Sequence, residues 1–129
     1  MNNPSLRVLV VESQGLIAVE IEDILTEKLG CSVTITAHAE FGDALANGRY
    51  DVVLVDAAPS KAENLARAEQ IEASGAATVF LSAYEDFSPN ARSSHGFPII
   101  DKPFDPFHLV ETVKAAAAHR YDSAPDAQG

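Results

Sequence analysis

Five short apolar segments, separated by stretches with helical periodicity, constrain the fold of this chain more than any other feature. Most of them are rich in valine or isoleucine, and their apolar residues follow one another without alternating with polar ones. Continuous apolar strands are typical of parallel sheets covered on both faces. The segments that we predict as strands are Leu6–Val11, Val33–Ala37, Val52–Val55, Ala77–Leu81 and Pro98–Ile100.

The segments between these strands predict helices. In the clearest one, Ile17, Ile21 and Leu25 form an apolar stripe, and Gly30 follows as a stop signal. Strands that alternate with helices imply right-handed crossovers, and therefore an α/β fold with a parallel sheet between two layers of helices. The predicted helices cover residues 16–29, 40–47 and 61–73, and a last one begins at the capping pair Asp105-Pro106.

Residues 83–96 differ from the other connections. They contain Pro89 and three serines, which make a poor helix interior. We therefore expect the fourth helix to be weak or short.

Length and charge narrow the class of protein. A chain of 129 residues predicts one domain, which we place at residues 6–119, with an N-terminal extension at 1–5 and a flexible C-terminal tail at 120–129. The net charge of −10 repels a phosphate backbone, so we expect no direct DNA binding. The apolar segments are too short for a membrane span and no secretory signal is visible, so we expect a cytoplasmic protein without a membrane partner.

Chemically active side chains stand at the carboxyl ends of the predicted strands. Parallel sheets bind ligands beyond these ends, where the strand order reverses. Two acids, a hydroxyl and a lysine suit phosphoryl transfer, which needs a carboxylate nucleophile, a seat for a divalent cation and donors to the transferred oxygens. Each residue alone favours a structural role, so their combination carries the weight. The two acids are Glu12, which is followed by Ser13 after the first strand, and Asp56 after the third; the hydroxyl is Ser82 after the fourth, and the lysine is Lys102, which follows Asp101 after the fifth.

Taken together, these segments resemble the receiver domain of bacterial response regulators. The resemblance extends over residues 6–118, and it implies a doubly wound, five-stranded parallel sheet in the order 2-1-3-4-5, of the flavodoxin-like, CheY-like type. It also implies a phosphoacceptor module of a two-component phosphorelay rather than an enzyme with a substrate of its own. Four motifs carry it: Arg7–Glu12, Tyr50–Asp56, Thr78–Tyr84 and Ile99–Phe104.

The resemblance assigns a role to each site residue. Asp56 would attack the phosphorus of a phosphohistidine on a sensor histidine kinase or phosphotransfer protein, and a downstream protein would read the result. Mg²⁺ would be held by Glu12, Asp56 and the backbone carbonyl of Ala58. The phosphoryl oxygens would be bound by Lys102, the Ser82 hydroxyl and the backbone N–H of Ala57.

Three positions depart from the family pattern. Ser13 stands where the second acidic residue is usual, so a direct metal ligand is missing and Mg²⁺ affinity should fall. Ile99 replaces the aromatic switch residue, and Phe97 is too far from Lys102 to substitute for it. Pro59 is one residue closer to Asp56 than usual.

Alternatives to the receiver function remain open. Because of Ser13, the fold could serve as a phosphorylation-independent docking module, and a small flavodoxin-like redox or hydrolytic enzyme is a third hypothesis. The four histidines show no paired spacing for zinc, which favours ordinary surface histidines. No phosphate-binding loop or dinucleotide motif is present in the sequence.

Overall fold

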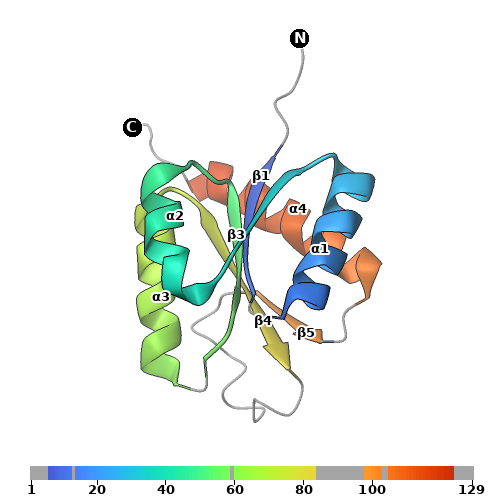
Figure 1. Cartoon of the computed structure of the whole chain (residues 1–129). Helices are drawn as coiled ribbons and strands as arrows, with labels where there is room; N and C mark the ends of the chain where they lie inside the picture. The colour runs from blue at the N-terminus through green and yellow to red at the C-terminus, as the bar shows by residue number, and fades with distance from the viewer. Residues whose placement is uncertain (1–5, 13, 59, 84–97, 103–104, 124–129) are drawn as a thin grey trace.

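The computed structural model describes residues 6–12, 14–58, 60–83, 98–102 and 105–123. For residues 83, 101, 102 and 119–123 it describes the backbone only. Strands and helices alternate along the chain, as the sequence predicts, and the sheet lies between two layers of helices (Figure 1).

The sheet has five parallel strands in the order β2-β1-β3-β4-β5, which confirms the predicted topology. The residues Val8–Val11 and Val52–Val55 in the two central strands are fully buried, which explains why their sequences do not alternate. The strands are β1 (Arg7–Val11), β2 (Ser32–Thr36), β3 (Val52–Asp56), β4 (Ala77–Ala83) and β5 (Ile99–Lys102).

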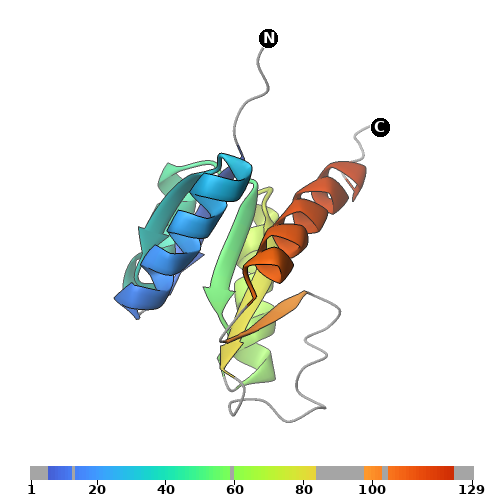
Figure 2. The same cartoon turned by 90° about the vertical axis from the view of Figure 1, so that its right-hand side faces the viewer.

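Two helices cover each face of the sheet. On one face, α1 (Gly15–Leu29) and α4 (Pro106–Ser123) lie side by side, as Figure 2 shows. On the other face are α2 (Phe41–Asn47), which follows the 3-10 turn η1 (His38–Glu40), and α3 (Lys61–Ala73). Alternate residues of β1, β3, β4 and β5 pack into one or the other of two apolar clusters, so a single sheet anchors both layers.

Gly30 and Asp105 mark helix ends as predicted, and Ser60 caps a third helix. Gly30 follows α1 with a φ of 66°, a left-handed conformation that suits glycine. The Asp105 carboxylate accepts a hydrogen bond from the His108 N–H at 3.2 Å and so caps the start of α4. The Ser60 hydroxyl accepts one from the Glu63 N–H at the start of α3.

Several elements extend further than predicted. Helix α4 continues to Ser123, past residue 120, where we expected a flexible tail to begin, and residues 124–129 lie outside the described part of the chain. Strands β4 and β5 each run two residues beyond their predicted ends at Leu81 and Ile100, because Ser82 and Ala83 pair with Asp101 and Lys102. The weak connection predicted at residues 83–96 falls almost wholly outside the described residues. None of the described helices is long and apolar enough to cross a membrane.

Candidate functional site

The strand register brings the predicted site residues to one edge of the sheet. Val11 of β1 pairs with Val55 of β3, so Glu12 and Asp56 each follow directly at the same level. Neighbouring strands are about 4.8 Å apart, so the backbones of these two acids are adjacent. This is the carboxyl edge of the sheet, where the arrowhead of β4 lies in Figure 1.

Strands β4 and β5 add the remaining predicted residues at the same edge. Asp56 pairs with Leu81 of β4, and Leu81 pairs with Ile100 of β5. Ser82 therefore lies one residue beyond the level of Asp56, and Lys102 lies two residues beyond it. Ser82 is buried. Ser13 lies outside the described residues.

Glu12 is a buried carboxylate, only 4% exposed. Its Oε2 accepts a hydrogen bond from the Gln14 N–H at 3.0 Å, and Gln14 occupies the position directly before α1. A charge this deeply buried is costly unless it is paired or hydrogen-bonded. Glu12 thus joins the carboxyl edge of the sheet to the beginning of α1.

Asp56 is the most accessible of the site carboxylates that the structure describes. Its side chain is 19% exposed, and its backbone carbonyl accepts a hydrogen bond from Arg67 Nη1 of α3 at 2.7 Å. The Arg67 contact holds the end of β3 against α3, so the Asp56 side chain projects from a fixed backbone.

The two residues after Asp56 are both held by hydrogen bonds within the fold. The Ala57 N–H donates to the Leu81 carbonyl at 2.8 Å and so continues the β3–β4 ladder. In this structure that N–H is therefore engaged by the sheet, and its role as a donor to a phosphoryl oxygen stays a prediction. The Ala58 carbonyl accepts a hydrogen bond from Asn64 Nδ2 at 2.9 Å, which leaves a carbonyl oxygen with capacity for one further partner.

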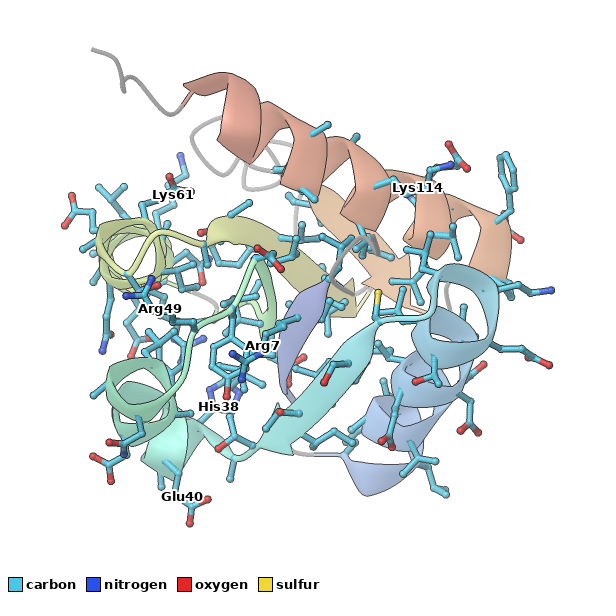
Figure 3. The ribbon with its side chains drawn as sticks, turned by 90° about the horizontal axis from the view of Figure 1, so that it is seen from above. Arg7, His38, Glu40, Arg49, Lys61 and Lys114 are labelled. Carbon is cyan, nitrogen blue, oxygen red and sulfur yellow. The ribbon has the colours of Figure 1, made fainter. Side chains whose placement is uncertain are left out.

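One residue of this site was not predicted. His38 begins η1, two residues after β2, and its Nε2 is 3.7 Å from Asp56 Oδ2. Figure 3 shows His38 directed towards the strands, whereas Glu40 of the same turn points away from them. The sequence did hold a signal, because a residue within a few positions of the end of a parallel strand stands at the same carboxyl edge as Asp56.

The departure at Ile99 also has a structural counterpart. Ile99 is half-buried and packs against the apolar cluster under α2 and α3, together with Phe80 and Val11. An aliphatic side chain in this position is part of the core. Ile99 therefore stands where the resemblance led us to expect an aromatic residue.

The donor set fits a hard divalent cation. Glu12 and Asp56 supply carboxylate oxygens and Ala58 supplies a carbonyl oxygen, the ligand types that Mg²⁺ prefers. In the part of the chain that the structure describes, however, no three His, Cys, Asp or Glu side chains converge as a preformed metal cluster. A cation here would complete its coordination with water or with oxygens of the ligand.

Comparisons with known proteins find similarity in structure only. No protein-family model matches the sequence, and the curated proteins include no significant match. Among solved structures, the signal receiver domain of an HD domain-containing protein from Pseudomonas fluorescens is 19% identical. The match covers 93% of this chain and 100% of that one, with a TM-score of 0.74.

Two further solved structures are similar to the chain to nearly the same extent. A CheY-like response regulator receiver domain protein from Methanospirillum hungatei is 21% identical, with 94% of this chain and 100% of that one covered and a TM-score of 0.71. A response regulator from Thermotoga maritima is 22% identical, with 89% and 99% covered and a TM-score of 0.69. The chain therefore has the fold of the response regulator receiver domains.

Proposed function

We propose that this chain is a two-component signalling receiver in which Asp56 accepts a phosphoryl group from a histidine kinase or phosphotransfer protein. The phosphorylated chain then signals through contacts with a downstream protein. The strand register carries this proposal, because it gathers Glu12, Asp56, Ser82 and the backbone of Lys102 at the carboxyl edge of one sheet.

The reaction is a displacement at phosphorus. An Asp56 carboxylate oxygen forms the new P–O bond, the P–N bond to the donor imidazole breaks, and the imidazole leaves with the electron pair and takes up a proton. The partial exposure of Asp56 gives a partner's phosphohistidine access to it. The Arg67 hydrogen bond to the Asp56 carbonyl fixes the backbone from which the nucleophile projects.

Charge is the main obstacle to this transfer. A phosphoryl group that approaches two carboxylates meets about 4 kcal/mol of repulsion per unit pair, at roughly 4 Å and an effective dielectric constant of about 20. When bound, Mg²⁺ would offset this charge as a Lewis acid. Glu12, Asp56 and the Ala58 carbonyl are the groups that would hold it.

Two further residues would bind the transferred group. Lys102 would form a charge-assisted contact with a phosphoryl oxygen, and the Ser82 hydroxyl would donate to another. Ser82 is buried at the end of β4, next to Asp101 of β5 in the register. Its hydrogen bond to the phosphoryl group would thus report phosphorylation to the segment that joins β4 to β5.

A second function is favoured by specific observations. Ser13 replaces an acid, the Ala57 N–H is engaged by the sheet, and His38 lies beside the Asp56 carboxylate. These features suit a pseudo-receiver, which keeps the receiver fold and binds a partner protein without being phosphorylated.

One titration separates the two functions. Backbone amide signals are recorded by NMR as Mg²⁺ and then a phosphate mimic are added to the wild type and to Asp56→Asn. The receiver function predicts that the signals of Asp56, Ala58 and Ser82 shift in the wild type when both are present, and that the variant does not respond. Unchanged signals in the wild type would favour the pseudo-receiver instead.

A further inference from the structure

We propose that two copies of this chain associate through the outer edge of β2, by antiparallel pairing of the two β2 strands around a two-fold axis at Thr34. In the sheet, β2 has a neighbour on one side only among the strands that the structure describes. A strand at the edge of a sheet offers N–H and carbonyl groups to a further strand. The association does not involve the carboxyl edge of the sheet, so it goes beyond the proposed function and does not depend on it.

The backbone of β2 directs alternate residues away from β1. The Ser32 N–H donates to the Leu6 carbonyl at 2.8 Å, so the backbone groups of Ser32 point towards β1. Successive residues of a strand direct these groups to opposite sides, so the N–H and carbonyl groups of Val33 and Ile35 point to the outer edge. With Val33 of one copy opposite Ile35 of the other, each residue donates to and accepts from its neighbour, as in the hydrogen-bonded pairs of an antiparallel ladder.

The sequence of β2 is self-complementary around Thr34. From Ser32 to Thr36 the side chains are hydroxyl, aliphatic, hydroxyl, aliphatic and hydroxyl, and the order is the same from either end. Antiparallel pairing centred on Thr34 therefore places aliphatic side chains opposite each other and hydroxyls opposite each other. A two-fold interface needs this property, because the same surface contributes both halves. The occupant that fits the edge is thus a second copy of the chain.

The pairing would also cover an exposed apolar side chain. Val33 is paired with Val8 of β1, and Ile35 with Val10, so both lie on the face of the sheet that α1 and α4 cover. Val33 packs against the apolar cluster there, whereas Ile35 is 38% exposed. In the dimer, Val33 of the second copy lies beside Ile35 and removes part of its surface from water.

The charge of the chain favours β2 as the place of contact. Each copy carries a net charge of −10, so two copies repel each other over most of their surface. Strand β2 holds no charged residue, and it contains neither the lysine nor the proline that commonly protects an edge strand from pairing. Two copies can therefore approach here without placing like charges opposite each other.

Sedimentation velocity of the full chain over a concentration series, at about 0.15 M salt to screen the net charge, tests the association. The wild type should show a monomer–dimer equilibrium. Thr34→Lys places two lysines opposite each other at the axis, so the dimer Kd should rise tenfold or more. Ala115→Lys is the matched control, because it makes the same charge change at an exposed position of α4, which packs on β3, β4 and β5. Its Kd should stay within about twofold of the wild type.

Two cysteine variants test the register. In the proposed dimer the Cα atoms of the two Thr34 residues are about 4.5 Å apart, within the range of about 4.4–6.8 Å that a disulfide needs. Thr36 lies opposite Ser32 of the second copy and is therefore about 14 Å from the other Thr36. Mild oxidation should cross-link Thr34→Cys into a dimer and leave Thr36→Cys monomeric on a non-reducing gel. The buried Cys31 is common to both variants.

Three results would overturn the proposal: a wild type that sediments as a monomer at every concentration, a dimer of Thr34→Lys as tight as that of the wild type, or equal cross-linking of the two cysteine variants. If Thr34→Lys fails to fold, the wild-type sedimentation and the cysteine pair decide, because Thr→Cys is a small change in an exposed strand. All these measurements are made without a phosphoryl donor, so their outcome is separate from that of the receiver function.

Discussion

Asn64 holds Ala58 by two hydrogen bonds at once. Its Oδ1 accepts from the Ala58 N–H at 2.7 Å, and its Nδ2 donates to the Ala58 carbonyl at 2.9 Å. Both residues are buried, so water offers little replacement for either bond. A side chain of α3 thus fixes the backbone two residues after the proposed phosphoacceptor.

Replacing this amide should destabilise the fold. Asn64→Ala leaves the Ala58 N–H and carbonyl without these partners, which should cost about 2–4 kcal/mol in the free energy of unfolding. Urea unfolding followed by circular dichroism measures the change. Glu69→Ala, an exposed change on the same helix, serves as the control and should alter stability by less than about 0.5 kcal/mol. A similar stability for both variants would show that the Asn64 bonds contribute little.

Cys31 provides a probe of the folded state. Burial, with a contribution from Asp51, raises the pKa of its thiol above the ordinary value of 9.0. As the pH rises, the unfolded chain therefore loses this proton before the folded chain does. The contribution of the protonated thiol to the free energy of unfolding is present below about pH 9 and declines as the pH rises towards the pKa of the folded state. We expect a thiol reagent at pH 8 to react much more slowly with the native protein than with the protein in denaturant. Equal rates would mean that the thiol is accessible in the fold.

Much of the architecture could be predicted because the strand patterns and the helix-end residues point to the same fold. The uninterrupted apolar runs of β1 and β3 required burial on both faces, and Gly30 and Asp105 marked helix ends through their own backbone and side-chain chemistry. The end of β4 was placed too early, because Ser82 is polar. Ser82 is in a strand because it pairs with Asp101, which is far away in the sequence, and the residues around Ser82 do not predict this pairing.

The site was predictable only where it follows the strand ends. Glu12 and Asp56 could be placed together because parallel strands share one carboxyl edge. The position of His38 depends on the path of the chain after β2, and this path is set by the packing of α2 on the sheet. The hydrogen bond of the Ala57 N–H likewise depends on how far the β3–β4 ladder continues.

Lys102 should matter for the response more than for the transfer itself. Lys102→Ala removes a charge-assisted contact to the phosphoryl group, so Asp56 should still be phosphorylated, but more slowly, and the amide signal of Ser82 should no longer shift. Lys114→Ala is the control, because Lys114 lies on α4 and pairs with Glu111 at 3.6 Å. A normal Ser82 response in Lys102→Ala would refute the role assigned to this lysine.

Restoring an acid next to Glu12 tests whether Ser13 limits the metal site. Ser13→Asp adds a carboxylate ligand of the type Mg²⁺ prefers, so Mg²⁺ affinity should rise about tenfold, which corresponds to about 1.4 kcal/mol. Without metal the variant should be slightly less stable, because a further carboxylate adds like-charge repulsion. Calorimetry of both proteins measures the affinity. An equal affinity would show that Ser13 does not limit Mg²⁺ binding.

Mass spectrometry after incubation with acetyl phosphate and Mg²⁺ tests the receiver function most directly. The wild type should gain a single phosphoryl group, localised to Asp56 by peptide mapping, because this carboxylate is the partly exposed nucleophile at the carboxyl edge of the sheet. Asp56→Asn keeps the shape of the side chain but is a far poorer nucleophile, so it should fold normally and gain none. Phosphorylation of Asp56→Asn, or a wild type that stays unmodified with Mg²⁺ present, would contradict the assignment of Asp56 as the phosphoacceptor.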